Sequence, residues 1–391
     1  MSDFIHLTNK TEYSLSEGAL PIARISELCQ AFKMPAVGIT DTNNMFGALE
    51  FSEKVSSVGV QPIIGCNLKI KTPKNYLHEN IEEEDLHFFL NIFSKNEVGY
   101  KNLLNIISSA YMNHKENAYV DIEQLYKNKE GLLVLSGGNN SILKYSNGNS
   151  ITSQSASFVA DFKKEFIDNF YIEIQRIEGN DYRIDEEVIL NLAYDNNIPV
   201  VATNDVYFEG PDHFEAHDAL MCIEKKLFVS QKDRKRLSKN HYFKSQNEMQ
   251  ELFSDIPEAL FNTIEIAQRC SHRPKIKMPV LPSYHNDDSQ EKKLLRELSR
   301  KGLEENLAQK FMSEQIDDNS QLNIKKEYEE RLEKELKIII DMKYEGYFLI
   351  VAIFRVEDCE EVVQVCKIMN EIGETSWILD RKLQVVFSDK T

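Results

Sequence analysis

The first 210 residues alternate between short β-rich runs and longer segments of helical periodicity, and this alternation restricts the fold more than any other feature. Because parallel strands need crossover helices between them, the alternation predicts βα units. Six or seven units in about 200 residues favour a (β/α) barrel over an open sheet, with functional groups at the carboxyl ends of the strands. The predicted strands are 4–7, 36–40, 60–70, 88–94, 131–138, 170–176 and 198–205, and the predicted helices between them are 19–34, 45–59, 97–111, 151–168 and 182–197.

The pattern turns helical after residue 205. Helices are predicted at 214–226, 246–253 and 254–270, and then at 290–306 and 325–342 beyond a proline-bearing stretch. The charged segment 78–87 is predicted to be a loop. We therefore divide the chain into a barrel core (1–210), a helical end of the same domain (211–271), a linker (272–289), the helical start of a second region (290–352) and a divergent tail (353–391).

The formal net charge of −17 argues against a strong nucleic-acid binder, because phosphate contacts need clustered Lys and Arg. The single dense basic run, 225–236, is expected to be a solvated face. The sequence contains no run of eighteen apolar residues that would predict a membrane span. The first ten residues lack the pattern of a secretory signal. Six scattered cysteines without a CxxC pair fit reduced thiols. We expect a cytoplasmic protein.

Ten segments carry more specific information because they occur in one order at a characteristic spacing. They are FIHLTNKTEYSLSEGALPI (4–22), MPAVGITDTNNMFGALEF (34–51), QPIIGCNL (61–68), SKNEVGYKNLLNI (94–106), LVLSGG (133–138), YIEIQR (171–176), PVVATNDVYF (199–208), FEAHDAL (214–220), FSDIPEALFNTIEIAQRC (253–270) and YEGYFLIVA (344–352). Together they resemble the N-terminal part of bacterial DNA polymerase III alpha subunits over residues 3–352. The resemblance implies an α/β fold: a polymerase-and-histidinol-phosphatase (PHP) type (β/α)₇ barrel. A mainly helical segment that leads towards a polymerase palm and thumb would follow it.

In metal-binding members of this family, His, Asp, Glu and Cys side chains at strand ends hold up to three divalent ions, zinc or manganese. Carried over position by position, the resemblance leaves ligand-type side chains at Glu17, Asp41 and Asp205. The ligand of the fourth strand aligns with Phe89, or with His87 if the gap is shifted. Other ligand positions hold Thr8, Lys10, Thr42, Asn67, Gly138 and Tyr207.

Lys10 is the most informative of these replacements. A charged ammonium has no lone pair for a metal, so near Asp41 and Asp205 it would replace the cation and form ion pairs with them. The metal site is then vestigial, and we expect no cofactor in this chain. The alternative is a single residual metal bound through Glu17, Asp41, His6 and Asp205.

Structural roles compete with these functional ones. In TDTNNMFG (40–47), Asn43 and Asn44 turn the chain into a helix, so Asp41 more often caps or pairs than ligates. His217 on its helix is expected to be structural. The aromatic pairs Phe88-Phe89 and Tyr242-Phe243 are expected to lie in the core rather than to stack on bases.

After Ala352 the sequence shows no glycine-rich loop and none of the aspartate motifs that hold magnesium in the family's palm. Residues 360–379 weakly resemble the C-terminal end of aminoimidazole ribonucleotide synthetase, although an amphipathic helix and a strand explain them equally well. We therefore expect a replication protein without polymerase activity of its own. It would be a scaffold for the proofreading 3′–5′ exonuclease (epsilon) subunit and other replicase subunits, with weak or no DNA binding and no membrane contact. The alternatives are a metal-dependent phosphoesterase or exonuclease of the PHP class, and a remnant without a role.

Overall fold

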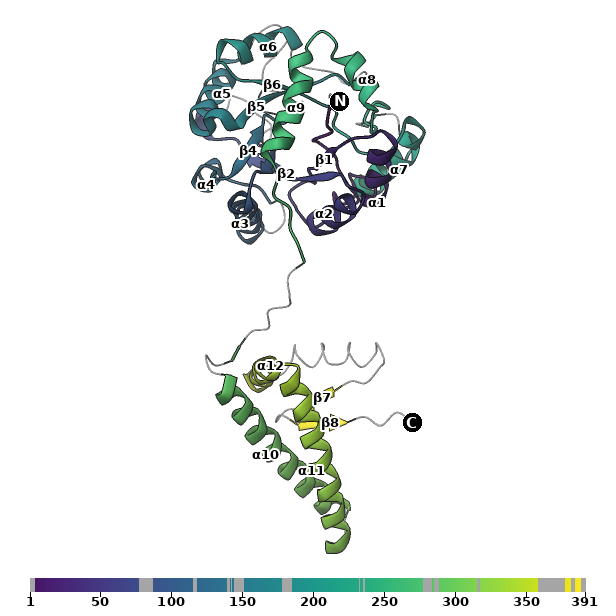
Figure 1. The fold of residues 1–391 in the computed structure, drawn as a ribbon, viewed down its shortest axis with the longest axis vertical. Helices are drawn as coiled ribbons and strands as arrows, with labels where there is room; N and C mark the ends of the chain where they lie inside the picture. Colours follow the sequence, from purple (N-terminus) through teal and green to yellow (C-terminus); the bar gives the residue numbers. More distant parts are fainter. Residues whose placement is uncertain are drawn as a thin grey trace. The chain divides into compact units, whose positions relative to one another are not determined.

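The chain divides into two compact units, Met1–Ile276 and Lys277–Thr391, which are described separately (Figure 1). The predicted loop at 78–87 lies outside the described residues except for its last position, and so does most of the predicted tail helix. The computed structural model describes residues 4–76, 87–114, 118–138, 141, 143, 151–177, 185–231, 233–234, 236–276, 283–284, 288–314, 317–357, 377–380 and 384–387.

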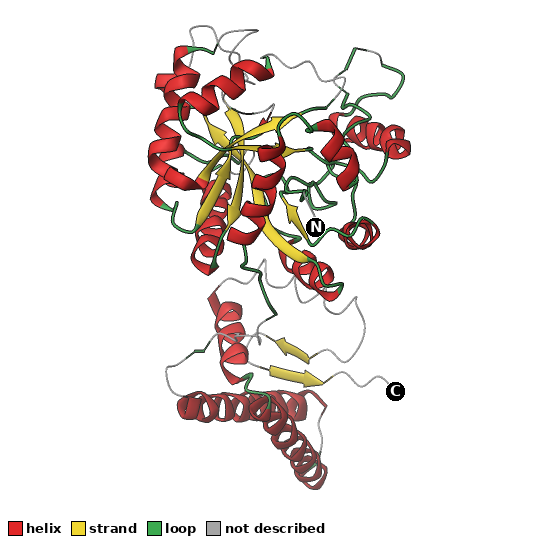
Figure 2. Ribbon diagram, turned by 45° about the horizontal axis from the view of Figure 1, so that its top comes forward, coloured by secondary structure: helices red, strands yellow, loops and turns green. Residues whose placement is uncertain are grey.

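A curled six-stranded sheet, with its strands in chain order, forms the centre of the first unit (Figure 2). The pairs β1–β2, β4–β5 and β5–β6 are parallel, as predicted. The expectation that every strand is parallel is wrong for β3, which runs antiparallel to both neighbours. An antiparallel pair needs no crossover helix, and a short 3₁₀ turn, η1 (Lys74–Tyr76), follows β2. The strands are β1 (Ala36–Ile39), β2 (Gln61–Lys71), β3 (His87–Ser94), β4 (Leu132–Leu135), β5 (Phe170–Gln175) and β6 (Val200–Thr203).

The N-terminal segment 4–10 joins the two edges of this sheet. On one side, Gly38 N of β1 donates to His6 O at 2.7 Å. On the other side, Lys10 N donates to Val206 O at 2.8 Å, just beyond β6. The segment therefore takes the place of a seventh strand, and the predicted α/β barrel is confirmed.

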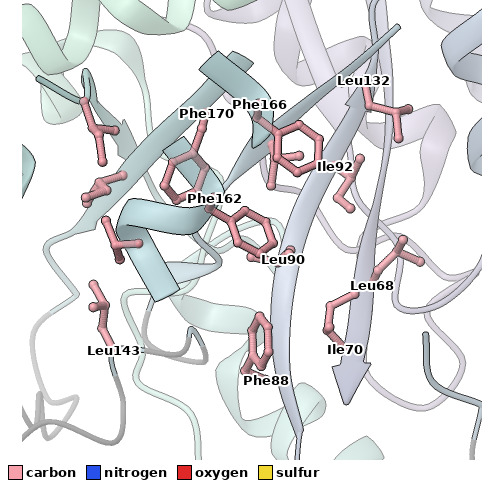
Figure 3. Packing of buried hydrophobic residues seen from close by; sticks show 14 of the residues in the cluster. Leu68, Ile70, Phe88, Leu90, Ile92, Leu132, Leu143, Phe162, Phe166 and Phe170 are labelled. Atoms are coloured by element: carbon pink, nitrogen blue, oxygen red, sulfur yellow. The ribbon is translucent and has the colours of Figure 1, made fainter. Parts of the chain in front are cut away.

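Helices cover the outside of the sheet, because one face of each strand is apolar. Figure 3 shows Phe162 and Phe166 of α5 beside Phe170 of β5 and Leu90 of β3. The Phe162 and Phe170 ring centroids lie 5.4 Å apart. Full burial of each such side chain stabilises the fold by about 1.5–3 kcal/mol. The covering helices are α1 (Ile22–Ala31), α2 (Ala48–Ser57), α3 (Glu97–Asn113), α4 (Ile122–Lys127), α5 (Ser153–Phe166) and α6 (Glu186–Asp195), and η5 (Ile167–Asn169) leads from α5 into β5.

Three helices follow β6, where the sequence predicts a helical end of the domain: α7 (Phe214–Lys225), α8 (Gln246–Leu252) and α9 (Pro257–Arg269), with η6 (Pro211–His213) before them. Pro257 occupies the first turn of α9, where its missing N–H costs no hydrogen bond. Ile266 of α9 belongs to a second buried cluster with Ile5 and Val201. Ile5 N also donates to Thr263 Oγ1 at 3.0 Å. Because of these contacts, α9 is part of the barrel's core.

The second unit is mainly helical, with a short antiparallel hairpin. Its core includes Leu295, Leu332, Leu336 and Leu349. No helix among the described residues is both long and apolar enough to cross a membrane. The elements are α10 (Asp288–Glu314), α11 (Asp318–Asp341), α12 (Glu345–Glu357), β7 (Trp377–Asp380) and β8 (Gln384–Phe387).

Candidate functional site

Buried and half-buried polar side chains gather where the strands end, which is the edge that carries function in a (β/α) barrel. We call this group the mouth cluster. It combines residues of the N-terminal segment and the turn after it, of the loops after β1 and β6, of strands β2, β3, β5 and β6, of α7, and of the segment before α8. Its members are Lys10, Thr11, Ser14, Glu17, Thr40, Asp41, Thr42, Asn67, Asn91, Glu173, Gln175, Thr203, Asp205, Tyr207, His217 and His241.

Asp41, directly after β1, is an acceptor for the turn that follows the N-terminal segment. Its Oδ1 accepts from Thr11 N at 2.7 Å and from Ser14 Oγ at 2.6 Å, and its Oδ2 accepts from Thr11 Oγ1 at 2.8 Å. Burial raises the pKa of Asp41, while the hydrogen bonds from Ser14 and Thr11 and the charge of Lys10 oppose that rise. Both carboxylate oxygens are therefore occupied by donors of the chain itself.

Lys10 is buried, with only 2% of its surface exposed. Its ammonium donates to Thr40 O at 2.7 Å. The prediction that Lys10 forms ion pairs with Asp41 and Asp205 is wrong. Neither of these carboxylates has an oxygen within 4.0 Å of the Lys10 ammonium nitrogen. The side chain instead reaches the last carbonyl before Asp41. Its charge acts on that carboxylate at longer range.

Glu17 and Thr42 face each other across the same turn. Thr42 Oγ1 donates to a Glu17 carboxylate oxygen, and Thr42 N donates to Ser14 Oγ at 3.2 Å. His217 of α7 bonds through Nε2 to the Glu17 backbone carbonyl at 2.6 Å. Burial lowers the pKa of His217, so the neutral ring is favoured as the donor of this bond. Here a threonine and a backbone contact stand where the resemblance implies metal ligation.

Asp205, two residues after β6, bonds to protein groups in a similar way. Tyr207 donates its hydroxyl to Asp205 Oδ2 at 3.2 Å, and His241 Nδ1 bonds to the Asp205 carbonyl at 2.8 Å. Burial raises the pKa of Tyr207 well above its usual range and lowers the pKa of His241. His241 is a mouth residue that the sequence analysis did not identify.

His6 faces different partners from the surviving acids. Its Nε2 bonds to Lys244 O at 2.7 Å, and its ring lies 4.8 Å from the Phe4 ring and 4.2 Å from the Phe243 ring. Burial lowers the pKa of His6 to about 4. Thr8, two residues on, is buried, and its hydroxyl finds no hydrogen-bond partner among the described residues.

Glu173 of β5 is the central acid of the mouth cluster, and the sequence analysis did not single it out. It accepts from Asn91 Nδ2 at 3.0 and 3.1 Å, from Gly137 N at 2.7 Å and from Thr203 Oγ1 at 2.9 Å. Burial raises its pKa to about 7, while these hydrogen bonds oppose the rise and the charge of Asp205 adds to it. The available signal was a Glu inside YIEIQR, a strand that is otherwise suited to burial.

Two further predicted positions adjoin this network. Asn67 Nδ2 donates to Asn91 Oδ1 at 2.8 Å, which links β2 to β3. Gly138 has a φ of +55°, and a Cβ there would lie 2.3 Å from Gln175 Oε1. At these positions the chain supplies an amide and bare backbone instead of metal ligands.

The mouth cluster does not fit a metal ion. Among the residues that the structure describes, no three His, Cys, Asp or Glu side chains are grouped so as to hold one. The oxygens of Asp41 and Glu173 point at protein donors, and a buried ammonium lies beside Asp41. The arrangement instead holds the strand ends and loops together.

The basic run 225–236 is only partly the solvated face that we expected. Arg234 forms a buried, two-pronged ion pair with Asp218 of α7, and these side chains are 4% and 3% exposed. Arg236 joins the same carboxylate at 3.1 Å. Two of the cations therefore fix this segment to α7, while Lys225 and Lys226 remain exposed.

Comparison with known proteins identifies relatives of this chain by sequence. Residues 6–177 match the PHP domain, and residues 293–363 match the bacterial DNA polymerase III alpha NTPase domain. DNA polymerase III subunit alpha of Caulobacter vibrioides is 38% identical over 354 residues, which cover 90% of this chain and 30% of the relative. The chain is homologous to the PHP-containing N-terminal region of the DNA polymerase III alpha subunits.

Other relatives give the same result for this PHP region. The alpha subunits of Rickettsia bellii and Escherichia coli are 36% and 34% identical over 90% of this chain, and the matches cover 29% and 30% of those proteins. The chain thus spans about 30% of the length of its curated relatives. A two-domain protein from Bacteroides vulgatus containing a predicted PHP-like metal-dependent phosphoesterase is 9% identical with a TM-score of 0.34, over 68% of this chain and 69% of that one. A similarity of that size says nothing about chemistry.

Proposed function

We propose that this chain acts in DNA replication as a non-catalytic docking module of the bacterial replicase in the cytoplasm. One observation carries the proposal. The carboxylates at the barrel mouth, where a metal-dependent phosphoesterase needs open ligands, accept hydrogen bonds from the chain's own side chains and backbone. A barrel held together in this way can present surfaces to partners without performing chemistry.

The rim of the mouth offers such a surface. Leu15 and Phe46 are 72% and 65% exposed, although each belongs to a loop that is fixed to its neighbour. Asn44 Nδ2 donates to Tyr13 O at 2.9 Å and so connects the two loops. Large apolar side chains on a rigid, exposed site are typical of interaction hot spots. We call Leu15, Phe46 and the neighbouring exposed Leu49 the rim patch.

The partner that we propose for the rim patch is the proofreading exonuclease (epsilon) subunit of the replicase. The family resemblance supports this choice, and so does the charge around the patch. Glu12, whose carboxylate accepts from Ile22 N, is exposed and precedes Leu15 in the same loop. Glu50, which accepts from the Tyr13 hydroxyl at 2.8 Å, is exposed and follows Leu49 in the sequence. The complementary segment would therefore combine apolar side chains with Lys or Arg.

Binding of the exonuclease subunit to the immobilised full chain tests the proposal. Leu15→Asp and Phe46→Asp are each expected to weaken binding at least tenfold, because a charge would enter a desolvated contact. Met112→Asp is the matched control, since Met112 is 80% exposed on α3 of the same unit. Equal affinity of wild-type and both rim variants would contradict the rim patch. Primer extension by the chain alone would contradict the non-catalytic role.

The phosphoesterase alternative makes the opposite prediction. It requires manganese-dependent hydrolysis of an aryl phosphate that chelation abolishes and that Asp41→Ala removes. We expect no hydrolysis above the level of that variant. A remnant without a role would bind no replicase subunit at all, so the same binding experiment also tests that alternative.

A further inference from the structure

The antiparallel hairpin of β2 and β3 has one buried and one half-exposed face, and the half-exposed face has a distinctive composition. Directly paired residues share a face, and side chains alternate between faces. The pairs on the half-exposed face are Asn67 with Asn91, then Lys69 with Phe89, and then Lys71 with His87. The other face, which includes Leu68, Ile70, Phe88 and Leu90, is buried in the core. Phe88 is thus the core residue that the sequence predicts, whereas Phe89 lies on the opposite face.

A third segment extends this face at the free edge of β2. Val120 N donates to Lys69 O at 2.9 Å, and Lys71 N donates to Val120 O at 3.0 Å. The Lys71 ammonium lies 5.2 Å from the Tyr119 ring centroid. His114 stacks on that ring with centroids 3.7 Å apart. These contacts place Tyr119 and His114 beside the two lysines.

His87 completes this group from β3, with its ring centroid 5.1 Å from that of Tyr119. Asn43 anchors the added segment, because its Nδ2 donates to Ala118 O at 3.1 Å and its Oδ1 accepts from Lys69 N at 2.8 Å. We call Lys69, Lys71, His87, Phe89, His114 and Tyr119 the basic strip. It consists of two lysines, two histidines and two aromatic residues in a chain whose net charge is −17.

We propose that the basic strip binds single-stranded nucleic acid. Cations along a groove contact phosphates, and aromatic rings between them stack with unpaired bases, which is the combination that single-strand binders use. Lys71 is exposed, and Tyr119, Phe89 and His114 are half-buried, so part of each side chain is in contact with solvent. The rings give nucleic acid an advantage over an acidic peptide, which would use only the cations.

The inner end of the strip limits how far the strand extends. Asn67 and Asn91 connect the strip to Glu173. Asn91 and Glu173 are buried there, so a phosphate that moved further into the barrel would have to displace the hydrogen bonds between them. The bound strand would therefore stop at the mouth cluster without being cleaved.

Fluorescence anisotropy of a labelled oligothymidylate of about 12 nucleotides, titrated with the full chain at low salt, tests the proposal. Lys71→Glu and Tyr119→Leu are each expected to weaken binding about tenfold, and Lys71→Arg is expected to keep it. Lys54→Glu on α2 and Phe261→Leu on α9 are matched controls, since both residues are exposed on other surfaces of the same unit. Circular dichroism shows whether each variant is folded.

The opposite results are equally specific. No binding by the wild-type chain would overturn the proposal, and so would an equal loss in Lys54→Glu and Lys71→Glu. Duplex DNA that bound as tightly as the single strand would contradict stacking on the rings. A polyglutamate peptide that displaced the oligonucleotide, together with unchanged binding by Tyr119→Leu, would indicate an acidic protein partner instead. The rim variants Leu15→Asp and Phe46→Asp should leave oligonucleotide binding unchanged, so this proposal and the docking function fail independently.

Discussion

Individual buried side chains at the barrel mouth determine whether it can hold a cation. Lys10 places a fixed positive charge beside Asp41, and both oxygens of Asp41 already accept bonds from Thr11 and Ser14. A divalent ion would have to displace those donors and come close to the ammonium. The sequence shows which residue types were exchanged, but it does not show that Lys10 bonds to the Thr40 carbonyl. The contact between the Lys10 ammonium and the Thr40 carbonyl oxygen, at 2.7 Å, is seen only in the folded chain.

His6 gives a prediction at the same scale. Its folded pKa of about 4 lies below the usual 6.5, so between these pH values the unfolded chain binds a proton that the folded chain does not. The contribution of neutral His6 to stability is therefore present above pH 6.5 and is lost as the pH falls towards 4. The free energies of unfolding of wild-type and His6→Gln are measured with urea. The difference between them should shrink by on the order of 3 kcal/mol as the pH falls from above 6.5 to below 4.

The comparison with His6→Gln is necessary because Glu173 acts in the opposite direction. Its pKa of about 7 lies above the usual 4.5, so its contribution is lost as the pH rises through that window. This contribution is the same in wild-type and variant and cancels in the difference. His213→Gln, at an exposed histidine, is the control. If the difference in free energy of unfolding between wild-type and His6→Gln did not change with pH, the conclusion that His6 is buried in its neutral form would be wrong.

At the scale of elements, the sequence predicts most strands and helices because apolar runs and helical periodicity alternate along the first 210 residues. The sequence does not predict that β3 is antiparallel. The direction of β3 depends on the path of the connection between β2 and β3, and the sequence shows only the length of that connection. It also leaves open how the N-terminal segment closes the barrel. At the mouth, Asn91 and Glu173 could not be grouped from sequence, because they lie 82 positions apart, on strands β3 and β5 with β4 between them.

The junction between the N-terminal segment and β1 gives a prediction for this closure. A Cβ at Gly38 would lie 2.2 Å from Leu7 O, which is backbone and cannot move alone. Gly38→Ala should lower the free energy of unfolding in urea by at least about 2 kcal/mol. At Gly210 the nearest atom to an added Cβ is the flexible Asp212 Oδ1 at 2.8 Å, so Gly210→Ala should change stability by less than about 0.5 kcal/mol. Similar effects of the two substitutions would show that the segment is not tightly paired with β1.

At the scale of the whole molecule, the chain combines an acidic net charge with local surfaces of a different character, among them the apolar rim patch and the basic strip. The net charge of −17 opposes general binding to nucleic acid, so contacts with a strand must be confined to one small surface. The second unit, Lys277–Thr391, matches a different region of the alpha subunits and is compact by itself.

The central claim is that the chain's own hydrogen bonds and Lys10 hold the barrel mouth together. Metal binding by the purified full chain tests this claim most directly. The chain is dialysed against zinc or manganese, its metal content is measured by mass spectrometry, and its melting temperature is followed with and without the ion. We predict a substoichiometric metal content and no rise in melting temperature, because no stable complex forms with the folded state. Stoichiometric metal that raised the melting temperature and was lost in Asp41→Ala would contradict the account.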